Sequence, residues 1–218
     1  MSTTISAVIF DLDGTLIDSS ESILDAYRAA FLSAGREPVI PLDSSIIGTP
    51  LQQTLQQLAG EEDDEVVTNL AHAFMQHYDN VGYLKTQVFD GVDALLRDAQ
   101  SAGYRLFIAT NKRIRPTRLI LEHLRWTDLF QEAYALDAFE PRLPSKAELI
   151  DRILMLHQLQ AADCLYVGDR DEDRLAAQAC DVPFFCARWG YGLSRTEAGN
   201  PAHPSAEGIS WLRRLLEV

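Results

Sequence analysis

The stretch "VIFDLDGTLIDSS", residues 8–20, opens with a short apolar run and then places two carboxylates one residue apart, Asp11 and Asp13. The apolar run predicts a buried strand, and Gly14 with Thr15 predicts that the chain turns directly after it. Two like charges at the end of a buried strand repel each other, and removing them from water is costly. The pair therefore indicates a bound cation, a chemical role, or simply a solvated strand end.

The chain has 218 residues, 47% of them apolar, which suits one large domain or two small ones. Its 19 Lys and Arg against 32 Asp and Glu give a net charge of −13, so we expect no nucleic-acid partner and no anionic membrane surface. No segment approaches the roughly 20 apolar residues of a membrane helix. The three cysteines lack metal-site spacing, and together with the absence of a signal peptide they indicate a cytoplasmic protein. The oligomeric state is left open between a monomer and a small homo-oligomer.

Apolar runs rich in β-forming residues alternate with segments of helical period over most of the chain, which predicts a parallel sheet covered by helices on both faces. We expect strands over 7–10, 104–110, 164–169 and 183–188, with a weaker candidate over 132–137. We expect helices over 91–103, 116–124, 146–159 and 173–180. The fold class is therefore α/β, with a Rossmann-like core formed by residues 1–15 and 88–218.

Residues 16–87 interrupt this alternation. Helical patterns cover 18–35, 50–60 and 64–80, the first expected to be capped by Asp18, and no convincing strand stands out. The acidic run 61–65 is expected to be a solvated turn and helix start. We expect an all-helical cap domain inserted after the first strand.

Several of the predicted strands end in polar side chains that can bind a metal ion or take part in catalysis. Asp11 and Asp13 follow the first strand, Thr110 ends the second, and Asp169 follows the third. Because binding sites of open parallel sheets lie at the carboxyl ends of the strands, these groups should converge. Carboxylates at one point suit Mg²⁺, which prefers oxygen ligands. Asp11 and Asp169 are the obvious ligands, with a backbone carbonyl near Asp13 as a third.

Such a site could act on phosphorus. One carboxylate could serve as nucleophile and a second as general acid and base. The Thr110 hydroxyl and a lysine could hold the phosphoryl oxygens and neutralise the charge that develops on them.

Four segments, in order, resemble the motifs of the haloacid-dehalogenase-like hydrolase superfamily, particularly its phosphatases. They are "DLDGT" (11–15), "ATN" (109–111), the lysine of "PSKAEL" (144–149) and "GDRDED" (168–173). The helical insertion directly after the first motif is similar to the cap of the phosphoglycolate-phosphatase-like branch. The acid at Asp13 favours phosphoryl chemistry over dehalogenation, because dehalogenases lack an acid at that position.

The resemblance implies a role for each matching residue. Asp11 would be the nucleophile that forms an aspartyl-phosphate, and Asp13 would protonate the leaving oxygen and then deprotonate the attacking water. The remaining roles would be phosphoryl binding by Thr110, Asn111 and Lys146, and a Mg²⁺ site formed by Asp11, the Asp13 carbonyl, Asp169 and, through water or directly, Asp173. The substrate would be a small phosphorylated metabolite such as phosphoglycolate, a nucleotide or a sugar phosphate.

Several positions stay open at this level. Lys112 competes with Lys146 for the phosphoryl group, and Arg113 stands where the branch often has proline. The segment 189–192 either lines the pocket edge or packs as a turn. The acidic pair Asp171 and Glu172 is expected to be ordinary helix-start charge. The five histidines lie outside the motifs and are expected to be surface or packing residues; they are His72, His77, His123, His157 and His203.

Three alternatives remain to be weighed. A phosphomutase of the same superfamily would hold a second phosphate with basic cap residues, yet residues 16–84 carry only Arg28 and Arg36 besides histidines, and Ile23 stands where mutases have a histidine. A response-regulator receiver also uses strand-end aspartates, Mg²⁺, a threonine and a lysine, but it has no cap. A degenerate relative that binds ligands without turnover would be expected to have lost some of the four motifs.

Overall fold

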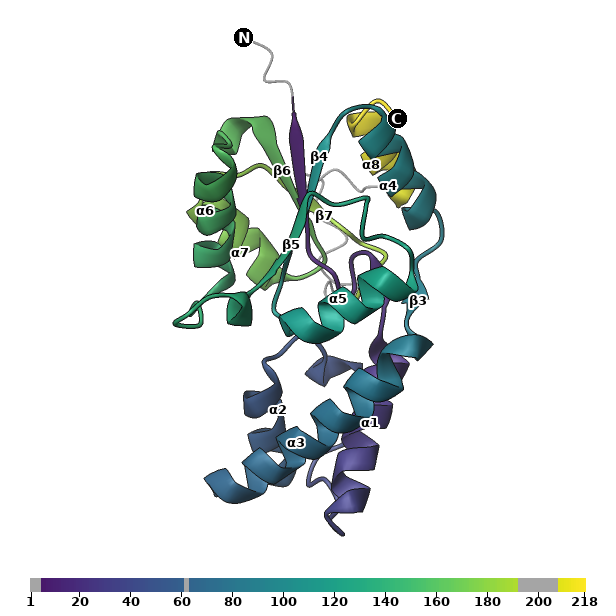
Figure 1. Ribbon diagram of the computed structural model, residues 1–218, viewed down its shortest axis with the longest axis vertical. Coiled ribbons are helices and arrows are strands. Elements are labelled where there is room, and N and C mark those ends of the chain that lie inside the picture. Colours follow the sequence, from purple (N-terminus) through teal and green to yellow (C-terminus); the bar gives the residue numbers. More distant parts are fainter. Residues whose placement is uncertain (1–4, 61–62, 192–207) are drawn as a thin grey trace.

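The computed structural model describes residues 5–60, 63–191 and 208–218. Figure 1 shows an α/β part that contains the sheet and a helical part, α1 to α3, that lies beyond one edge of it. The predictions made for Glu61, Glu62, Gly192 and His203 lie outside the described residues.

A five-stranded sheet with the order β5-β4-β1-β6-β7 forms the centre of the α/β part, and all of its pairings are parallel. Its strands are β1 (Ala7–Phe10), β4 (Arg105–Thr110), β5 (Glu132–Ala135), β6 (Cys164–Gly168) and β7 (Phe184–Cys186). β1 lies in the middle, where Phe10 pairs with Ile108 of β4 and Val167 of β6. The residues that follow β1, β4 and β6 are therefore brought to one edge.

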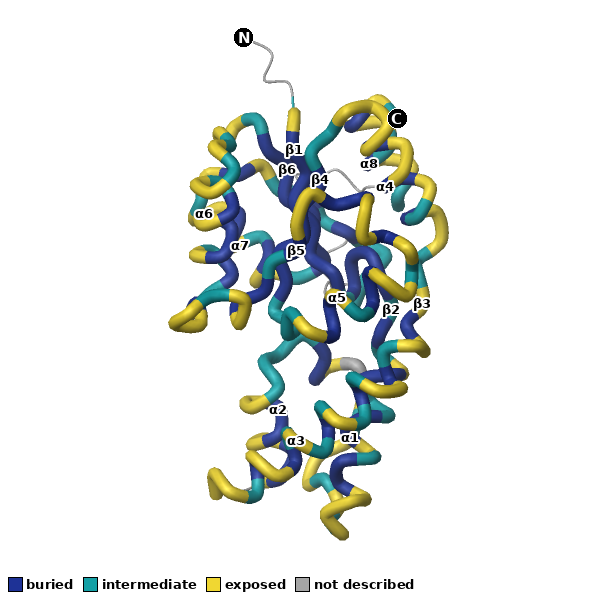
Figure 2. The backbone as a smooth tube through the Cα atoms, viewed as in Figure 1, coloured by how far each residue is buried: buried dark blue, intermediate teal, exposed yellow. Residues whose placement is uncertain are grey.

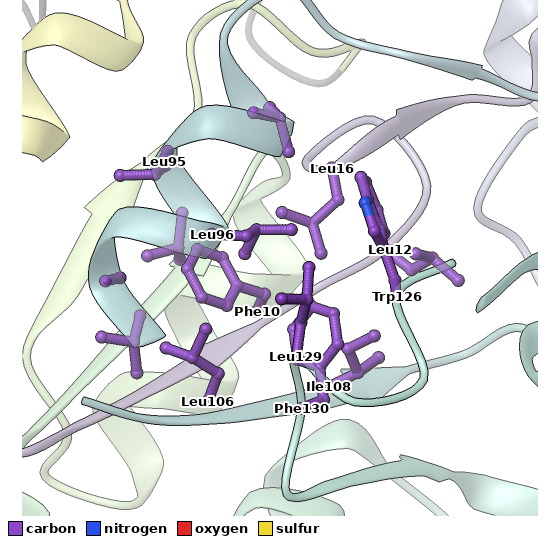
Figure 3. Packing of buried hydrophobic residues seen from close by; sticks show 14 of the residues in the cluster. Phe10, Leu12, Leu16, Leu95, Leu96, Leu106, Ile108, Trp126, Leu129 and Phe130 are labelled. Atoms are coloured by element: carbon purple, nitrogen blue, oxygen red, sulfur yellow. The ribbon is translucent and has the colours of Figure 1, made fainter. Parts of the chain in front are cut away.

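Side chains of the central strands alternate between two hydrophobic clusters, as expected for strands buried on both faces. Val8 and Phe10 belong to one cluster, which Figure 3 shows packed against Leu95, Leu96 and neighbouring residues, whereas Ile9 belongs to the other. The first cluster includes α4 (Val92–Ser101), α5 (Ile114–His123) and α8 (Ile209–Leu215). The second includes α6 (Lys146–His157) and α7 (Asp171–Ala179). Short 3₁₀ turns lie at η3 (Leu136–Ala138) and η4 (Ala161–Asp163).

The helical part has a hydrophobic core of its own. Its elements are α1 (Ser20–Ser33), η1 (Ser44–Ile46), α2 (Leu51–Ala59), α3 (Asp64–Asn80) and η2 (Gly82–Lys85). The buried side chains of Phe31, Leu55, Leu58 and Leu70 form the centre of this cluster, and Figure 2 shows that the buried positions of the three helices face one another. The separate core is what an inserted cap requires.

The structure confirms the predicted sheet and its covering helices, and it differs from the sequence predictions at several ends. The helix expected from residue 116 begins at Ile114, and Pro116 lies within its first turn, where backbone N–H groups need no helical partner. The helix expected from Asp18 begins at Ser20, with Asp18 accepting hydrogen bonds from the Ser20 N–H and hydroxyl.

Three elements were not predicted. β2 (Ile17–Asp18) and β3 (Gln87–Val88) form a short antiparallel ladder where the chain enters and leaves the helical part, so the expectation of no strand within 16–87 was wrong. The helix α8 at the end of the chain was also missed. Within the described ranges, no helix is long and apolar enough to cross a membrane.

An ion pair joins the helical part to the α/β part. Asp79 near the end of α3 accepts two hydrogen bonds from the Arg113 guanidinium, at 2.5 and 3.1 Å. The Asp79 side chain is 8% exposed, whereas Arg115, 3.5 Å from the same carboxylate, is 73% exposed. Arg113 is the residue that departs from the proline common in the resembling branch, and here it ties the two parts together.

Arg113→Gln is expected to lower the free energy of unfolding by about 1–3 kcal/mol, because the buried Asp79 carboxylate loses its two-pronged partner. The matched control Arg115→Gln is expected to change it by less than about 0.5 kcal/mol, since that pair is long and solvent-screened. Urea denaturation of both variants measures the difference. Equal effects of the two substitutions would contradict this assignment.

Candidate active site

Asp11, directly after β1, forms the centre of the site. Its Oδ1 lies 2.9 Å from Nζ of Lys146, the first residue of α6, and the same ammonium lies 2.5 Å from Oδ1 of Asp173 in α7. All three side chains are buried, with exposures of 7, 5 and 0% for Asp11, Lys146 and Asp173. One lysine therefore faces two carboxylates in the interior.

Asp173 is held from three sides. Besides Lys146, its Oδ1 accepts a hydrogen bond from the Tyr166 hydroxyl at 3.2 Å, and its Oδ2 accepts from the Arg170 N–H at 3.0 Å. The last contact caps the start of α7 and fixes the carboxylate against the sheet edge. Both oxygens of Asp173 thus have partners within the protein.

Asp169, directly after β6, has one unsatisfied oxygen. Its Oδ2 accepts from the Tyr191 N–H at 2.8 Å, whereas its Oδ1 is buried and has no hydrogen-bond partner. Glycines surround it closely: a Cβ on Gly190 would overlap the Gly14 carbonyl oxygen, and Gly14 itself has φ +88°. Glycine is therefore required at both positions for the backbone to approach Asp169.

Electrostatics in this corner favour added positive charge. Burial, opposed by Lys146 and reinforced by Asp173 and Asp169, raises the pKa of Asp11. Burial and the charge of Asp173 raise the pKa of Asp169 from 3.8 to about 6. The neighbouring carboxylates also raise the pKa of Lys146 well above 10.5, against the effect of its burial, so the lysine stays charged. Three carboxylates thus lie together, and one ammonium contacts only two of them.

The residues present fit a hard divalent cation. Oxygen atoms of Asp11, Asp169 and Asp173 all lie within 4.8 Å of one another. The unpartnered Oδ1 of Asp169 is the kind of buried atom that a cation would satisfy, and carboxylate oxygens are ligands for Mg²⁺ and Ca²⁺. Asp11 and Asp169 offer direct ligands, while Asp173, already hydrogen-bonded through both oxygens, is placed beside them.

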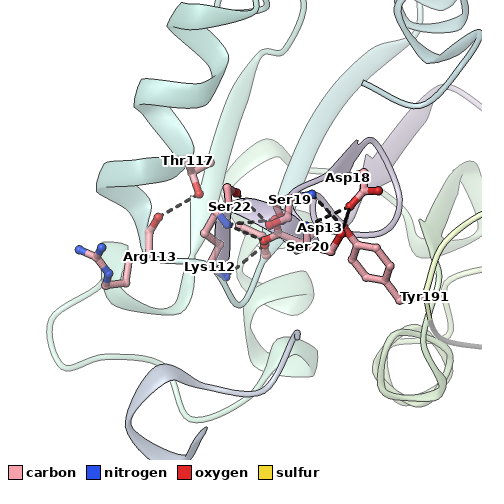
Figure 4. Close-up of polar contacts among 10 residues, drawn as sticks. Asp13, Asp18, Ser19, Ser20, Ser22, Lys112, Arg113, Thr117 and Tyr191 are labelled. Carbon is pink, nitrogen blue, oxygen red and sulfur yellow. Dashed lines mark hydrogen bonds and ion pairs between the residues drawn. The ribbon is translucent and has the colours of Figure 1, made fainter. Parts of the chain in front are cut away.

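Asp13 lies in a different environment from Asp11. Lys112 Nζ donates to both of its oxygens, at 2.9 and 3.0 Å, and the Ser19 hydroxyl donates to Oδ1 (Figure 4). The Asp13 side chain is 12% exposed. The Lys112 ammonium also lies 4.7 Å above the ring of Tyr78 on α3. Lys112 and Lys146, which the sequence left in competition, are thus assigned to different carboxylates.

A cavity of about 240 Å³ lies between the helical part and the sheet edge. The sequence-predicted residues that border it are Asp11, Asp13, Thr110, Asn111, Lys112 and Lys146. Thr110 is buried and its hydroxyl accepts from the Lys112 N–H at 3.2 Å. Asn111 donates to Glu172 at 3.0 Å, and its Oδ1 is buried without a partner. Asp169 and Asp173 lie outside the lining, behind Asp11 and Lys146.

Sequence reasoning missed some partners of the site residues. Ser19 and Tyr166 touch Asp13 and Asp173, respectively. The only signal for Tyr166 was a hydroxyl near the end of an apolar strand, and Ser19 carried none. In the segment 189–192, none of the described residues borders the cavity; Trp189 packs against the first hydrophobic cluster and the Tyr191 hydroxyl donates to Asp18 at 2.7 Å (Figure 4), which favours the packed-turn interpretation.

Comparison with known proteins shows to which family the chain belongs. The model of the haloacid dehalogenase-like hydrolase family matches residues 8–187. The chain belongs to that family. It is 29% identical over 198 residues to a phosphoglycolate phosphatase from Psychrobacter arcticus, covering 86% of this chain and 85% of that one. It is 32% identical over 214 residues to a 5′-nucleotidase from Pseudomonas aeruginosa, covering 96% and 95%.

A solved structure extends the comparison. Protein tyrosine kinase A (PtkA) of Mycobacterium tuberculosis superposes with a TM-score of 0.77 at 30% identity, covering 99% of both chains. The family generally uses a divalent metal, and the acidic cluster of Asp11, Asp169 and Asp173 is present here. The three proteins named carry different activities in their names, so family membership alone leaves the substrate of this chain undetermined.

Asp169→Asn is expected to stabilise the metal-free protein. Because the pKa of Asp169 is raised to about 6 in the folded state, its charge costs stability above that pH, and the cost vanishes below the unfolded value of 3.8. At pH 8 without divalent metal, the variant should therefore unfold with a free energy about 1–3 kcal/mol higher than wild type. Chemical denaturation at pH 8 measures this difference.

The same variant separates metal binding from stability. Mg²⁺ should raise the melting temperature of wild type and leave that of Asp169→Asn nearly unchanged. Asp171→Asn, on a 64% exposed side chain in the same helix-start segment, is the matched control and should behave as wild type. An equal response of Asp169→Asn and wild type to Mg²⁺ would be incompatible with a metal site at Asp169.

Proposed function

We propose that this protein is a Mg²⁺-dependent phosphomonoesterase that hydrolyses small phosphorylated metabolites through a phosphorylated Asp11. The observation that carries the proposal is the placement of two carboxylates with different partners at the end of one strand. Asp11 lies against Lys146 and close to two further carboxylates, whereas Asp13 lies against Lys112 and Ser19. Both border the same cavity.

The two carboxylates suit two different roles. An Asp11 oxygen would attack phosphorus and form the acyl-phosphate bond as the bond to the substrate oxygen breaks. Asp13 would give its proton to that leaving oxygen and then take a proton from the water that attacks phosphorus. Attack of this water releases inorganic phosphate and regenerates the Asp11 carboxylate. The proton that Asp13 gives up is replaced from water, and the phosphoryl group leaves as inorganic phosphate. Both carboxylates therefore return to their starting state.

The remaining residues would hold the phosphoryl group. Thr110, Asn111 and Lys146 border the cavity next to Asp11, and they offer a hydroxyl, an amide and an ammonium to its oxygens. A divalent cation at Asp11, Asp169 and the Asp13 carbonyl, with Asp173 beside it, would neutralise charge on the phosphoryl oxygens. We further propose that residues 16–87 act as a cap over the core formed by 1–15 and 88–218 and exclude water from the reaction. The three cysteines are free thiols, which is compatible with a cytoplasmic enzyme.

A phosphomutase is the second candidate within the family, and the cavity disfavours it. A mutase would need a cationic group on the cap to hold a second phosphate. In the described part of the chain, the cap residues that border the cavity carry no charge. The receiver alternative lacks support because the chain belongs to a hydrolase family.

Asp11→Asn is expected to abolish Mg²⁺-dependent phosphate release, with a loss of at least about 10³-fold in kcat, because the amide is not a nucleophile toward phosphorus. Phosphate release from a panel of phosphomonoesters, with and without Mg²⁺, measures this. Asp171→Asn is the matched control and should retain wild-type activity. Full activity of Asp11→Asn would overturn the mechanism, and phosphoryl transfer from ATP to tyrosine without release from monoesters would favour a kinase.

Asp13→Asn is expected to affect the second half of the reaction most. An activated aryl phosphate needs little protonation of its leaving oxygen, so the phosphoenzyme should still form, whereas its hydrolysis needs a base and should slow by about 10²–10⁴-fold. Rapid-quench trapping of labelled protein should show phosphoenzyme accumulating in this variant and not in wild type. Unchanged hydrolysis would remove Asp13 from the proposed role.

A further inference from the structure

The two walls of the cavity differ in chemistry. The sheet edge contributes the charged groups, including Asp11, Asp13 and Lys146. The wall formed by α1, α3 and the segment 46–52 contributes apolar and neutral polar side chains, and among the described residues none on this wall is charged. A substrate would therefore place its phosphoryl group against the sheet edge and its body against an uncharged wall.

Three packed aromatic rings form part of that wall, beside aliphatic side chains. Tyr27 of α1 and Phe74 of α3 have ring centroids 4.6 Å apart, and the rings of Phe74 and Tyr78 lie 5.7 Å apart and nearly parallel, at 4°. All three residues border the cavity and are otherwise buried. Packed rings form a stiff surface that favours contact with another flat ring at 4.5–7 Å.

Three of the five cationic side chains that border the cavity are held by carboxylates. Lys146 faces Asp11 and Asp173, and Lys112 faces Asp13. Arg113 holds Asp79. A second negative group placed against the helical wall would meet no cation there, and an uncompensated charge against apolar side chains is costly. Arg142 and Arg170 are the opposing observations, since Arg142 borders the cavity and is exposed, and the buried Nε of Arg170, close to Gly48, has no hydrogen-bond partner.

We propose that the cavity wall selects phosphomonoesters whose body is a flat, uncharged ring system, such as an aryl phosphate or a nucleoside 5′-monophosphate, over compact substrates that carry a second negative group, such as the carboxylate of 2-phosphoglycolate. The inference rests on the proposed phosphatase function and adds its substrate class. Met75 is assigned as a specificity-determining residue. It lies on α3 between the aromatic positions, borders the cavity and is partly exposed, so a charged replacement can be accommodated there.

The test compares kcat/KM for phenyl phosphate, a nucleoside 5′-monophosphate and 2-phosphoglycolate in the presence of Mg²⁺. Wild type should prefer the better of the two ring substrates over 2-phosphoglycolate by at least about tenfold. Met75→Lys, which places an ammonium on the wall, should lower that ratio by about tenfold. Since all substrates are measured on one preparation, loss of folded protein cancels in the ratio.

Matched controls isolate charge from shape. Met75→Leu conserves volume without charge and should leave the ratio within about twofold of wild type. Met155→Lys makes the same exchange on a 58% exposed residue of α6 away from the cavity and should also leave it unchanged. Ala71→Lys, one turn before Met75 on the same wall, repeats the experiment if Met75→Lys does not fold.

The outcomes distinguish failure of the substrate-class inference from failure of the proposed phosphatase function. A wild-type preference for 2-phosphoglycolate would overturn this inference while leaving the phosphatase proposal intact, and its loss in Arg142→Gln or Arg170→Gln would identify the cation that holds the carboxylate. A ratio that Met75→Lys and Ala71→Lys both leave unchanged would do the same. Absence of Mg²⁺-dependent hydrolysis of every phosphomonoester would instead overturn the proposed function, and the substrate class with it. Preference for phenyl phosphate over the nucleotide, or the reverse, distinguishes which ring-bearing body fits.

Discussion

Burial of three carboxylates around one ammonium is the constraint on which the rest of the structure depends. Asp11, Asp169 and Asp173 place their oxygens within 4.8 Å of one another, and Lys146 contacts two of them. Isolated buried charge is among the most unfavourable features a protein can carry, and one lysine compensates only part of it. The surrounding fold must therefore hold these groups in place against their repulsion, which is typical of functional sites.

The parallel sheet supplies the rigidity. β1 is hydrogen-bonded on both sides, so the positions of Asp11 and Asp169 are set by pairing registers rather than by loops. Lys146 and Asp173 lie in the first turns of α6 and α7, which pack against the same face of the sheet. The charged machinery is thus built from the core alone. The inserted helices contribute neutral side chains to the cavity, so its charged and uncharged linings come from different parts of the chain.

The sequence alone predicted the strands of the central sheet, because they have long and regular apolar patterns. Long apolar runs such as 105–110 and 164–168 are buried on both faces, and their pattern is unambiguous. The two-residue strands β2 and β3 have no period to detect, because a ladder of that length is specified by tertiary pairing alone. The helix α8 was also not predicted; it has only seven residues, too few for a clear helical period.

The candidate site likewise has parts that the sequence predicted and parts that it did not. The ordered motifs predicted that Asp11, Asp13, Thr110, Lys146, Asp169 and Asp173 would converge, because each stands at a strand end or helix start that the sequence marks, and the structure brings them together. Their partners could not be read, since the contact of Tyr191 with Asp18 joins residues 173 positions apart. The pairing of Lys112 with Asp13 likewise depends on how the second strand end faces the first.

These unpredicted contacts connect the acidic cluster of Asp11, Asp169 and Asp173 to the junction with the helical part. Tyr191 donates its N–H to Asp169, donates its hydroxyl to Asp18, and accepts from the Ser19 N–H at 2.8 Å. Ser19 in turn donates to Asp13, directly before α1 begins. Movement of α1 relative to the sheet would therefore disturb hydrogen bonds at Asp13 and at the loop that positions Asp169. Because one continuous network spans both, the positions of Asp13 and of the loop that contacts Asp169 depend on where the helical part sits.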